Sequence, residues 1–321
     1  MSSEIILIVL GEPNSTFSEV LFRYFKSKNF KNSKNRIILI GSKRLFEEQM
    51  KKLNYNFHIN EITNLKKSLK KKINIINVNY MFKKPFSKIT SSSNKYIENS
   101  FDLALKLIKS GNLNKMINGP ISKKHFLKKK FPGITEYIAF KTNKNDQVML
   151  IYNHILSVCP LTTHIPIKNV ARQISKTKII STVKNIIEFY QLKLLKKPKI
   201  AILGLNPHCE TTSNISEEKK EIIPAIKYLV NKKINVSGPF SADTFFLSKN
   251  IKKFDVVIGM YHDQVLTPIK TLFKFDAINV TIGLPFVKVT PDHGPNFEMM
   301  GKNKSDPSSI FYAMRFLSKI K

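Results

Sequence analysis

Short apolar runs rich in Ile and Val alternate with longer, Lys-rich amphipathic stretches along this chain of 321 residues. The short runs predict buried β-strands at Ile5–Leu10, Arg36–Ile40, Ile73–Val78, Lys115–Ile117, His154–Leu161, Lys199–Leu205 and Asp255–Met260. The amphipathic stretches predict helices at Ser18–Lys28, Lys43–Leu53, Asn94–Lys109, Ile179–Leu192, Glu217–Asn231 and Pro307–Ile320. Because strands that alternate with helices are typical of βαβ units, the pattern predicts an α/β fold with a mostly parallel sheet.

The length and the apolar content indicate more than one domain. A single hydrophobic core stops growing near ~250–300 residues, so 321 residues with 42% hydrophobic content predict two α/β lobes. The Lys-rich stretch Lys123–Lys130, which precedes Phe131-Pro132-Gly133, is a candidate boundary. No apolar run reaches the ~18–20 residues that a membrane helix needs. Two cysteines without a CxxC motif fit a reducing compartment, so we expect a cytoplasmic protein that does not enter the membrane.

The formal net charge of +32 suggests a nucleic-acid or membrane-surface partner, but the distribution of the charge argues against both. Only five of the 54 basic residues are arginine, and the lysines are spread over the whole chain. A nucleic-acid patch favours clustered arginines with interleaved aromatic residues, which this sequence lacks. We therefore expect no nucleic-acid partner, and we interpret the positive field as one that favours an anionic substrate.

Histidines follow three of the predicted strands. His164 comes shortly after the strand that ends at Leu161, and His208 and His262 follow the next two runs in the same manner. Since the carboxyl ends of parallel strands open onto the binding crevice of an α/β sheet, three imidazoles would converge there if these strands are neighbours. Three imidazoles suit a divalent ion such as zinc or cobalt and leave one coordination position open for substrate.

Each of these histidines alone is more often an ordinary polar residue at the start of a loop. The three together favour a metal site more strongly than any one of them, because four of the seven histidines follow apolar runs in this half of the chain. The fourth of these histidines is His293. The neighbouring Cys209 is more often a small buried residue than a soft metal ligand.

Further polar residues cluster around the third histidine. Asp263 follows it directly and could orient it or act as a base, and Asp243 lies on a turn before a short helix. Lysine and amide side chains in the same region suit a phosphate-bearing substrate: Lys270, Asn279 and Lys288. The motifs GxGxxG, GxxxxGK[ST] and GxSxG are all absent, so neither a Rossmann dinucleotide site, nor a P-loop, nor a nucleophile elbow is supported.

Together these segments resemble the 4-hydroxythreonine-4-phosphate dehydrogenases of vitamin B6 biosynthesis, the PdxA family. The matching stretches run in family order over essentially the whole chain: Gly11-Glu12-Pro13, Asn118-Gly119-Pro120-Ile121, Phe131-Pro132-Gly133 with Thr135-Glu136-Tyr137, Thr162-Thr163-His164-Ile165-Pro166, Gly204-Leu205-Asn206-Pro207-His208, Gly238-Pro239 with Ala242-Asp243-Thr244, Met260-Tyr261-His262-Asp263-Gln264, Asn279 to Pro285, and Asp292-His293-Gly294.

The resemblance implies a two-domain fold like that of isocitrate and isopropylmalate dehydrogenases, with an interdomain cleft. The expected lobes are residues 1–125 with 263–321, and residues 126–262, which carry the metal histidines and the dimer contacts. The implied assembly is a homodimer with a shared active site. The implied reaction is NAD- or NADP-dependent oxidation of a phosphorylated hydroxy acid at its C3 hydroxyl, giving a β-keto acid that loses CO₂.

The resemblance also implies roles for individual residues. It implies a divalent metal (zinc, magnesium or cobalt) on His164, His208 and His262. The expected catalytic residues are Asp243, Asp263 and Lys270, and the expected substrate-binding residues are Thr135, Lys270, Asn279 and Lys288. The expected cofactor-binding residues are Asp292, His293 and Gly294.

This chain departs from the family pattern at several positions of the implied site. A family histidine before Thr135 is replaced by Ile134, which cannot form a hydrogen bond, and a substrate-contacting arginine is replaced by Lys288, which lacks the bidentate fork. The family's Gly-rich loops are here Asn14-Ser15-Thr16-Phe17 and Cys209 to Asn214. A dehydrogenase of the same fold that acts on another phosphorylated hydroxy acid is therefore the second hypothesis, and a basic nucleic-acid-binding protein without catalysis is a distant third.

Overall fold

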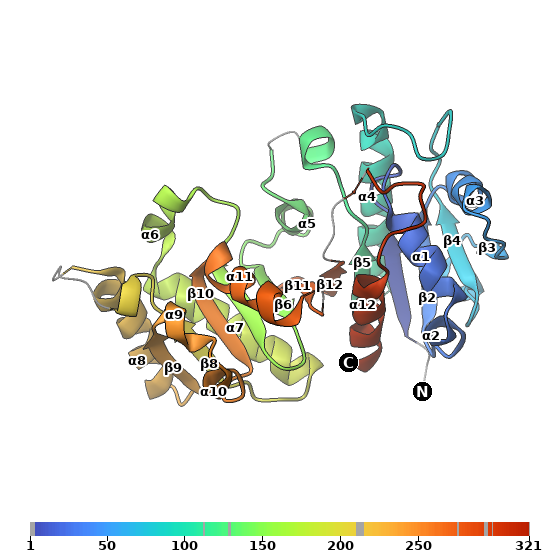
Figure 1. The fold of residues 1–321 in the computed structure, drawn as a ribbon. Helices are drawn as coiled ribbons and strands as arrows, with labels where there is room; N and C mark the ends of the chain where they lie inside the picture. Colours follow the sequence, from blue (N-terminus) through green and yellow to red (C-terminus); the bar gives the residue numbers. More distant parts are fainter. Residues whose placement is uncertain are drawn as a thin grey trace. The chain divides into compact units, whose positions relative to one another are not determined.

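The computed structural model describes residues 4–320 apart from 112, 128–129, 210–214, 275, 292–294 and 297, and the chain divides into two compact units (Figure 1). Unit 1 comprises Met1–Asn143 and Leu284–Lys319, and unit 2 comprises Lys144–Gly283 with Ile320–Lys321. Among the described residues, no helix is both long enough and apolar enough to cross a membrane.

Unit 1 contains six parallel strands in the order β3-β4-β2-β1-β5-β12. Their bounds are Ile59–Glu61 (β3), Ile73–Asn77 (β4), Arg36–Gly41 (β2), Ile5–Val9 (β1), Lys115–Asn118 (β5) and Val287–Thr290 (β12). Every residue of β1 is buried, because β1 lies in the middle of the order and both of its faces are covered. This explains why its sequence is a continuous apolar run rather than an alternating one.

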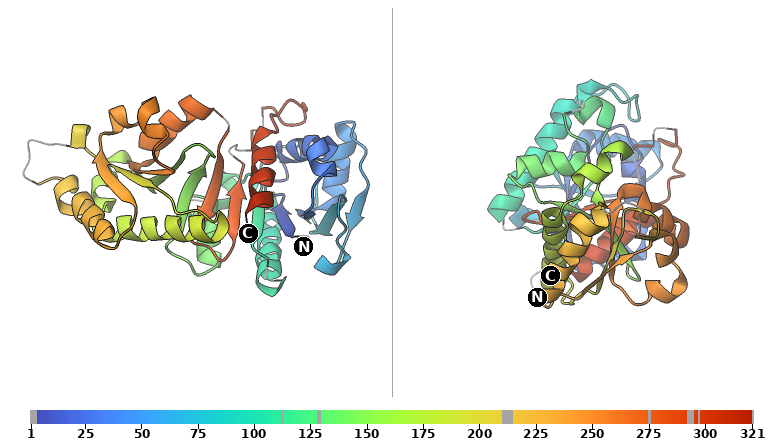
Figure 2. Two further views of the ribbon diagram at one scale, coloured as in Figure 1. Left: turned by 90° about the horizontal axis from the view of Figure 1, so that it is seen from below. Right: turned by 90° about the vertical axis from the view of Figure 1, so that its left-hand side faces the viewer.

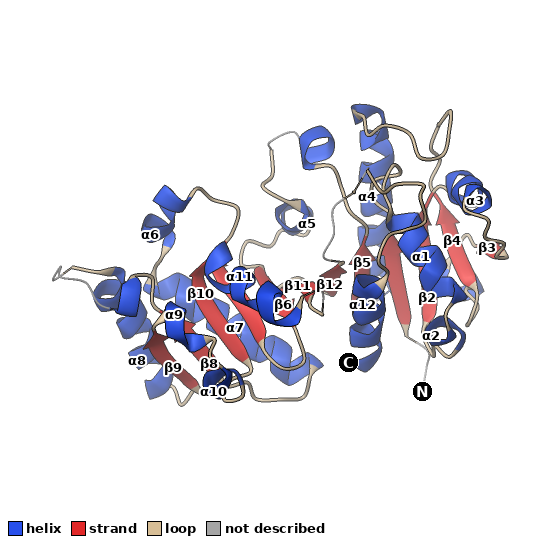
Figure 3. Ribbon diagram, in the orientation of Figure 1, coloured by secondary structure: helices blue, strands red, loops and turns tan. Residues whose placement is uncertain are grey.

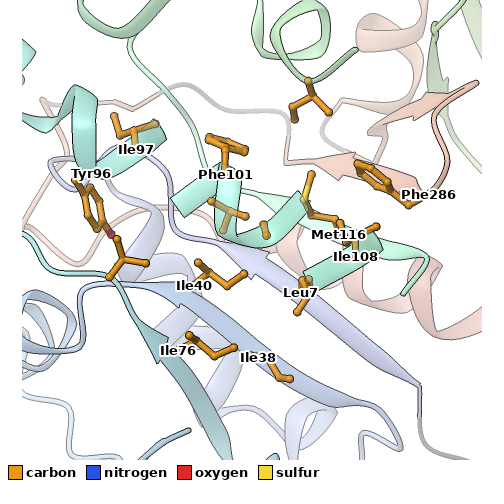
Figure 4. Close-up of a cluster of buried hydrophobic side chains, with 14 of the residues drawn as sticks. Leu7, Ile38, Ile40, Ile76, Tyr96, Ile97, Phe101, Ile108, Met116 and Phe286 are labelled. Atoms are coloured by element: carbon orange, nitrogen blue, oxygen red, sulfur yellow. The ribbon is translucent and has the colours of Figure 1, made fainter. Parts of the chain in front are cut away.

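Helices form the layers on the two faces of the unit 1 sheet (Figure 3). The helices of unit 1 are α1 (Phe17–Lys26), α2 (Lys28–Lys31), α3 (Lys43–Lys52), α4 (Asn94–Gly111), α5 (Ile134–Lys141) and α12 (Ser308–Lys319), with short turns at Leu65–Lys67, Ser91–Ser93 and Lys123–Leu127. In Figure 4, Ile97 and Phe101 of α4 face Leu7 and Ile40 of the central strands. This cluster of fully or nearly fully buried side chains is the core of unit 1 on the α4 side.

Unit 2 contains six strands in the order β11-β6-β7-β10-β8-β9. Their bounds are Ile278–Ile282 (β11), Val148–Tyr152 (β6), Ser157–Thr162 (β7), Val256–Tyr261 (β10), Ile200–Leu203 (β8) and Val236–Phe240 (β9). Strand β6 is antiparallel to both of its neighbours, whereas β7, β10, β8 and β9 are parallel. The carboxyl ends of these four strands therefore lie at one edge of the sheet.

The unit 2 sheet is also covered on both faces (Figures 1 and 2). Its helices are α6 (Val170–Gln173), α7 (Lys176–Lys193), α8 (Ile223–Asn231), α9 (Ala242–Phe245), α10 (Ser248–Ile251) and α11 (His262–Phe273), with short turns at Ile167–Asn169, Pro207–Cys209 and Glu218–Ile222. Helices α9 and α11 pack Phe245 and Val265 against Val158 and Ala201 of the strands. Helices α7 and α8 pack together and lie on the opposite face.

The structure confirms the α/β class, the mostly parallel strands and all the strands and helices expected above, within a few residues at their ends. The division differs from the expected boundaries at 125/126 and 262/263, because residues 126–143 lie in unit 1 and residues 263–283 lie in unit 2. The reason for the second difference is direct. Helix α11 packs on β7 and β10, and β11 pairs with β6, so both elements belong to the unit 2 sheet.

Candidate active site

The three strands that precede the candidate metal histidines are neighbours in the unit 2 sheet. Strand β10 lies between β7 and β8 and is parallel to both. His164 follows the end of β7 by two residues, His262 begins α11 directly after β10, and His208 follows β8 by five residues. The ring centroids of His164 and His262 are 6.1 Å apart. The adjacency on which the metal hypothesis depended is therefore present.

Carboxylates accompany two of the three imidazoles. A hydrogen bond of 2.6 Å joins Nδ1 of His262 to Oδ1 of Asp263, and Oδ2 of Asp243 lies 3.8 Å from Nδ1 of His208. The Ser241 hydroxyl donates to Asp243 and lowers the pKa of that carboxyl, and the nearby His208 lowers it further. Because the Asp263 carboxylate bonds Nδ1 of His262, the Nε2 atom of that ring is left for a ligand, as in the carboxylate–histidine pairs of metal sites. Asp243 lies at an ion-pair distance on the Nδ1 side of His208.

The backbone around the histidines is strained. His164 has φ of 47°, His208 has φ of 56° and Cys209 has φ of 58°, all in the left-handed region. This conformation costs roughly 1–2 kcal/mol for a residue with a Cβ, and such outliers are concentrated at functional sites. Two of the three candidate metal histidines therefore have a backbone conformation that their surroundings must stabilise.

The donor set suits a divalent metal ion, and one of the three rings is largely exposed. Three imidazoles with carboxylates behind them are the donors that zinc and cobalt prefer. Among the described residues, no three His, Cys, Asp or Glu side chains already form a group close enough to hold an ion. The His208 side chain is 75% exposed, so little of its ring is packed against other residues.

A second polar cluster lies in unit 1 around Lys288. This lysine, on β12, is fully buried; its Nζ donates to Thr290 Oγ1 (2.8 Å) and to Thr135 Oγ1 of α5 (3.3 Å). Thr290 in turn donates to Oδ1 of Asn118 at 2.8 Å. Burial lowers the pKa of Lys288 to about 7, and the charge of Glu136 opposes the shift. The structure thus brings together two of the expected substrate-binding residues, Thr135 and Lys288.

Sequence analysis missed Asn118 and Thr290 as functional candidates. A signal for both was present, because each stands at the carboxyl end of its strand, β5 or β12. Strand β12 itself was not predicted, so Thr290 could not be placed there.

The other expected residues occupy separate positions. Asn279 lies on β11, half-buried, and its Oδ1 atom is buried without a hydrogen-bond partner among the described residues, which leaves an acceptor that a ligand could satisfy. Lys270 is exposed in the last turn of α11, about 12 Å along the helix axis from His262 at 1.5 Å per residue. The expected cofactor residues Asp292, His293 and Gly294 lie outside the described residues.

The chain matches a family model and several curated sequences. Residues 33–317 match the model described as pyridoxal phosphate biosynthetic protein PdxA. The 4-hydroxythreonine-4-phosphate dehydrogenase of Sulfurihydrogenibium sp. (strain YO3AOP1) is 36% identical over 324 residues, covering 98% of each chain. The enzyme of the same name from Aquifex aeolicus is 32% identical, covering 98% of this chain and 97% of its own.

Solved structures show the same fold. The crystal structure of a 4-hydroxythreonine-4-phosphate dehydrogenase from Burkholderia phymatum has a TM-score of 0.83 and 27% sequence identity, with 99% of this chain and 98% of the other covered. The α/β arrangement of both units is therefore that of this group of dehydrogenases.

Proposed function

Because the chain belongs to the PdxA family of pyridoxal phosphate biosynthetic proteins, we propose that it oxidises 4-(phosphooxy)-L-threonine with NAD or NADP. The C3 hydroxyl becomes a ketone, and the product, 2-amino-3-oxo-4-(phosphooxy)butanoate, loses CO₂ to give 3-amino-2-oxopropyl phosphate. The observation that carries the proposal is the placement of three histidines at the carboxyl ends of three adjacent strands, in a chain similar over its full length to dehydrogenases of that name.

In this proposal His164, His208 and His262 hold a divalent metal (zinc, magnesium or cobalt). When bound, the metal supplies a Lewis acid that polarises the substrate hydroxyl and then stabilises the charge that develops on loss of CO₂. Asp263 and Asp243 hold their imidazoles with Nε2 toward the ion, which is supported by the contacts at Nδ1.

The polar cluster of unit 1 is proposed to receive the phosphate of the substrate. The Lys288 ammonium supplies positive charge and the Thr135 hydroxyl supplies a hydrogen bond, both at the same point. Asn279 is proposed to contact the substrate through its unsatisfied Oδ1 atom, and Lys270 to serve a site shared between two copies of the chain. Asp292, His293 and Gly294 are proposed to contact the nicotinamide cofactor.

Reduced cofactor production measures the proposed reaction directly. Purified protein loaded with zinc, cobalt or magnesium should form NADH or NADPH from 4-(phosphooxy)-L-threonine, and a chelator should abolish turnover until metal is restored. Release of CO₂ in step with NADH is the second readout. No turnover with any of the three metals and either cofactor would overturn the proposal.

Oxidation of a different phosphorylated hydroxy acid is the second candidate function. It is favoured by Ile134 and Lys288, which stand where the family has a histidine and an arginine. Buried Lys288 presents the point charge of an ammonium in place of the planar, bidentate guanidinium of the family's arginine. The substrate that suits it would then carry its anionic group at a different place from that of 4-(phosphooxy)-L-threonine. A panel of phosphorylated hydroxy acids compared by kcat/KM decides between the two. A value for another member that exceeds that of 4-(phosphooxy)-L-threonine would favour this candidate.

A further inference from the structure

Side chains join the ends of the three strands that carry the candidate metal histidines. The Thr162 hydroxyl, at the end of β7, donates to the carbonyl oxygen of Met260 on β10 at 2.7 Å. Gln264, in the first turn of α11, accepts from the Met260 N–H at 2.6 Å and donates from Nε2 to the carbonyl oxygen of Gly204 at 2.8 Å. Thr162 therefore links β7 to β10, and Gln264 links β10 to the end of β8.

These bonds lie at the ends of the two strand ladders. Regular pairing of β10 with β8 ends at Ile258 with Ile202, two residues before Met260. On the other side, the register of β10 with β7 passes from Gly259 and Pro160 to Tyr261 and Thr162, and Pro160 has no N–H to donate. Backbone pairing of β10 with β8 has therefore ended where Gln264 links them, and Thr162 adds a side-chain bond at the last pair of β10 with β7.

A buried carboxylate fixes the third loop. Glu218 is 1% exposed, and its Oε1 accepts from the backbone N–H groups of Leu205 and Asn206, each at 2.8 Å, while Oε2 accepts from Nδ2 of Asn206 at 2.8 Å. Burial alone would raise the pKa of Glu218, but these hydrogen bonds outweigh it and the pKa is lowered. The anchored residues stand two and three positions before His208.

We propose that Thr162, Gln264 and Glu218 are positioning residues that preorganise the metal ligands. None is a ligand itself; each holds the loop that carries one of the imidazoles, and thereby offsets the strain of the left-handed backbone at His164 and His208. Because outer residues that orient ligands commonly contribute 10–100-fold to metal affinity, about that loss is expected when one is removed. The inference rests on the metal site of the proposed function.

Thr162 offers the sharpest test, because valine has the same shape without the hydroxyl and serine keeps the hydroxyl. Cobalt affinity is measured by calorimetry, and the visible cobalt absorption reports the ligand geometry. We expect Thr162→Val to raise the Kd for cobalt about 10–100-fold and to change the absorption band, and Thr162→Ser to restore both. Gln264→Leu, similar in size, should behave as Thr162→Val does.

The matched control is Asn185→Leu. Asn185 also donates from its amide to a backbone carbonyl, that of Asp146 at 2.7 Å, but on α7 and not at the strand ends. The control should bind cobalt as the unaltered protein does. An equal loss of affinity in Asn185→Leu, or unchanged affinity and spectrum in Thr162→Val, would overturn the inference. An unaltered protein that binds no cobalt would instead overturn the metal site of the proposed function.

Discussion

Lys288 shows how one buried side chain sets a pH dependence. Burial places the pKa of its ammonium at about 7, below the ordinary value of 10.5, so the charged form is present below about pH 7 and is lost above it. Since a phosphate binds the charged form, KM for the phosphorylated substrate should rise by up to about tenfold per pH unit above 7. Steady-state kinetics between pH 6 and 8.5 measures the slope.

Lys288→Arg is the control, because arginine stays charged over this range and ionisation of the substrate is common to both proteins. The variant should lose most of the slope in KM. Equal slopes in the two proteins would show that Lys288 does not bind the phosphate.

Glu12 predicts a pH effect on stability. Burial raises the pKa of this carboxyl from 4.5 to about 7, against the bonds from the Asn14 N–H and the Ser93 hydroxyl. A raised carboxyl pKa means that the folded state binds the proton more tightly, so stability falls as pH rises from 4.5 to 7. Glu12→Gln should therefore add about 1–3 kcal/mol to the free energy of unfolding at pH 8 and little at pH 5.

Urea unfolding of Glu12→Gln at both pH values checks this, with Glu48→Gln, at a half-buried surface position, as the reference. A stability difference that is the same at pH 5 and pH 8 would contradict the prediction.

His208→Ala tests the metal triad at the level of one ligand. We expect the variant to retain no metal after gel filtration, because two imidazoles hold an ion far less tightly than three. Elemental analysis measures the metal content, and the exposed His58→Ala in unit 1 should retain metal as the unaltered protein does. Stoichiometric metal in His208→Ala would refute the triad.

At the scale of the element, strands that are buried on both faces were the ones that the sequence predicted. Strands such as β1 and β10 are largely apolar runs without polar alternation because helices cover both sides of them, and these strands were predicted. Strand β9 has Gly238 and Pro239 in its middle, and β3 has only three residues, so neither shows a strand pattern. The run Val280–Val287 belongs to two strands, because a turn at Gly283 to Phe286 divides β11 from β12.

The candidate site likewise has a part that the sequence predicted and a part that it could not predict. Sequence order showed that histidines follow strands, and parallel topology supplied their common edge. The sequence could not predict the hydrogen bond from Gln264 to the Gly204 carbonyl or the one from the Asn206 N–H to Glu218, because both bonds depend on loop conformations. Helix α11 was missed because Pro268, which normally breaks helices, lies within it.

Packing of the long helix α4 against the sheet should make a large contribution to the free energy of unfolding. Phe101 is fully buried in the unit 1 core and makes an edge contact with Tyr137 at 6.0 Å between ring centroids. Phe101→Ala should lower the free energy of unfolding by about 3–5 kcal/mol, because it leaves a cavity that rigid strands cannot fill. Lys106→Ala, on the exposed side of α4, should change it by less than about 0.5 kcal/mol. Similar values for the two variants in urea unfolding would contradict this packing.

At the scale of the whole molecule, the proposed homodimer with shared sites has a direct test. His208→Ala and Lys270→Ala should each be inactive alone. Suppose that each site combines the histidines of one copy with Lys270 of the other. Half of the dimers in a random equal mixture then contain one copy of each variant, and one of their two sites has no substitution. About a quarter of full activity should therefore return. Sedimentation should give twice the mass of one chain. No regained activity in a mixture shown to exchange subunits would contradict the sharing.

The split of unit 1 has a consequence for synthesis of the chain. Apart from Ile320–Lys321, unit 2 is the continuous segment Lys144–Gly283, whereas unit 1 needs β12 and α12, which come after that segment. As the chain leaves the ribosome, β5 must wait for its partner β12 until all of unit 2 has emerged. Unit 2, with the three candidate metal histidines, therefore completes first. A chain cut short after Gly283 retains nearly all of this unit, while the first sheet lacks the strand that carries Lys288.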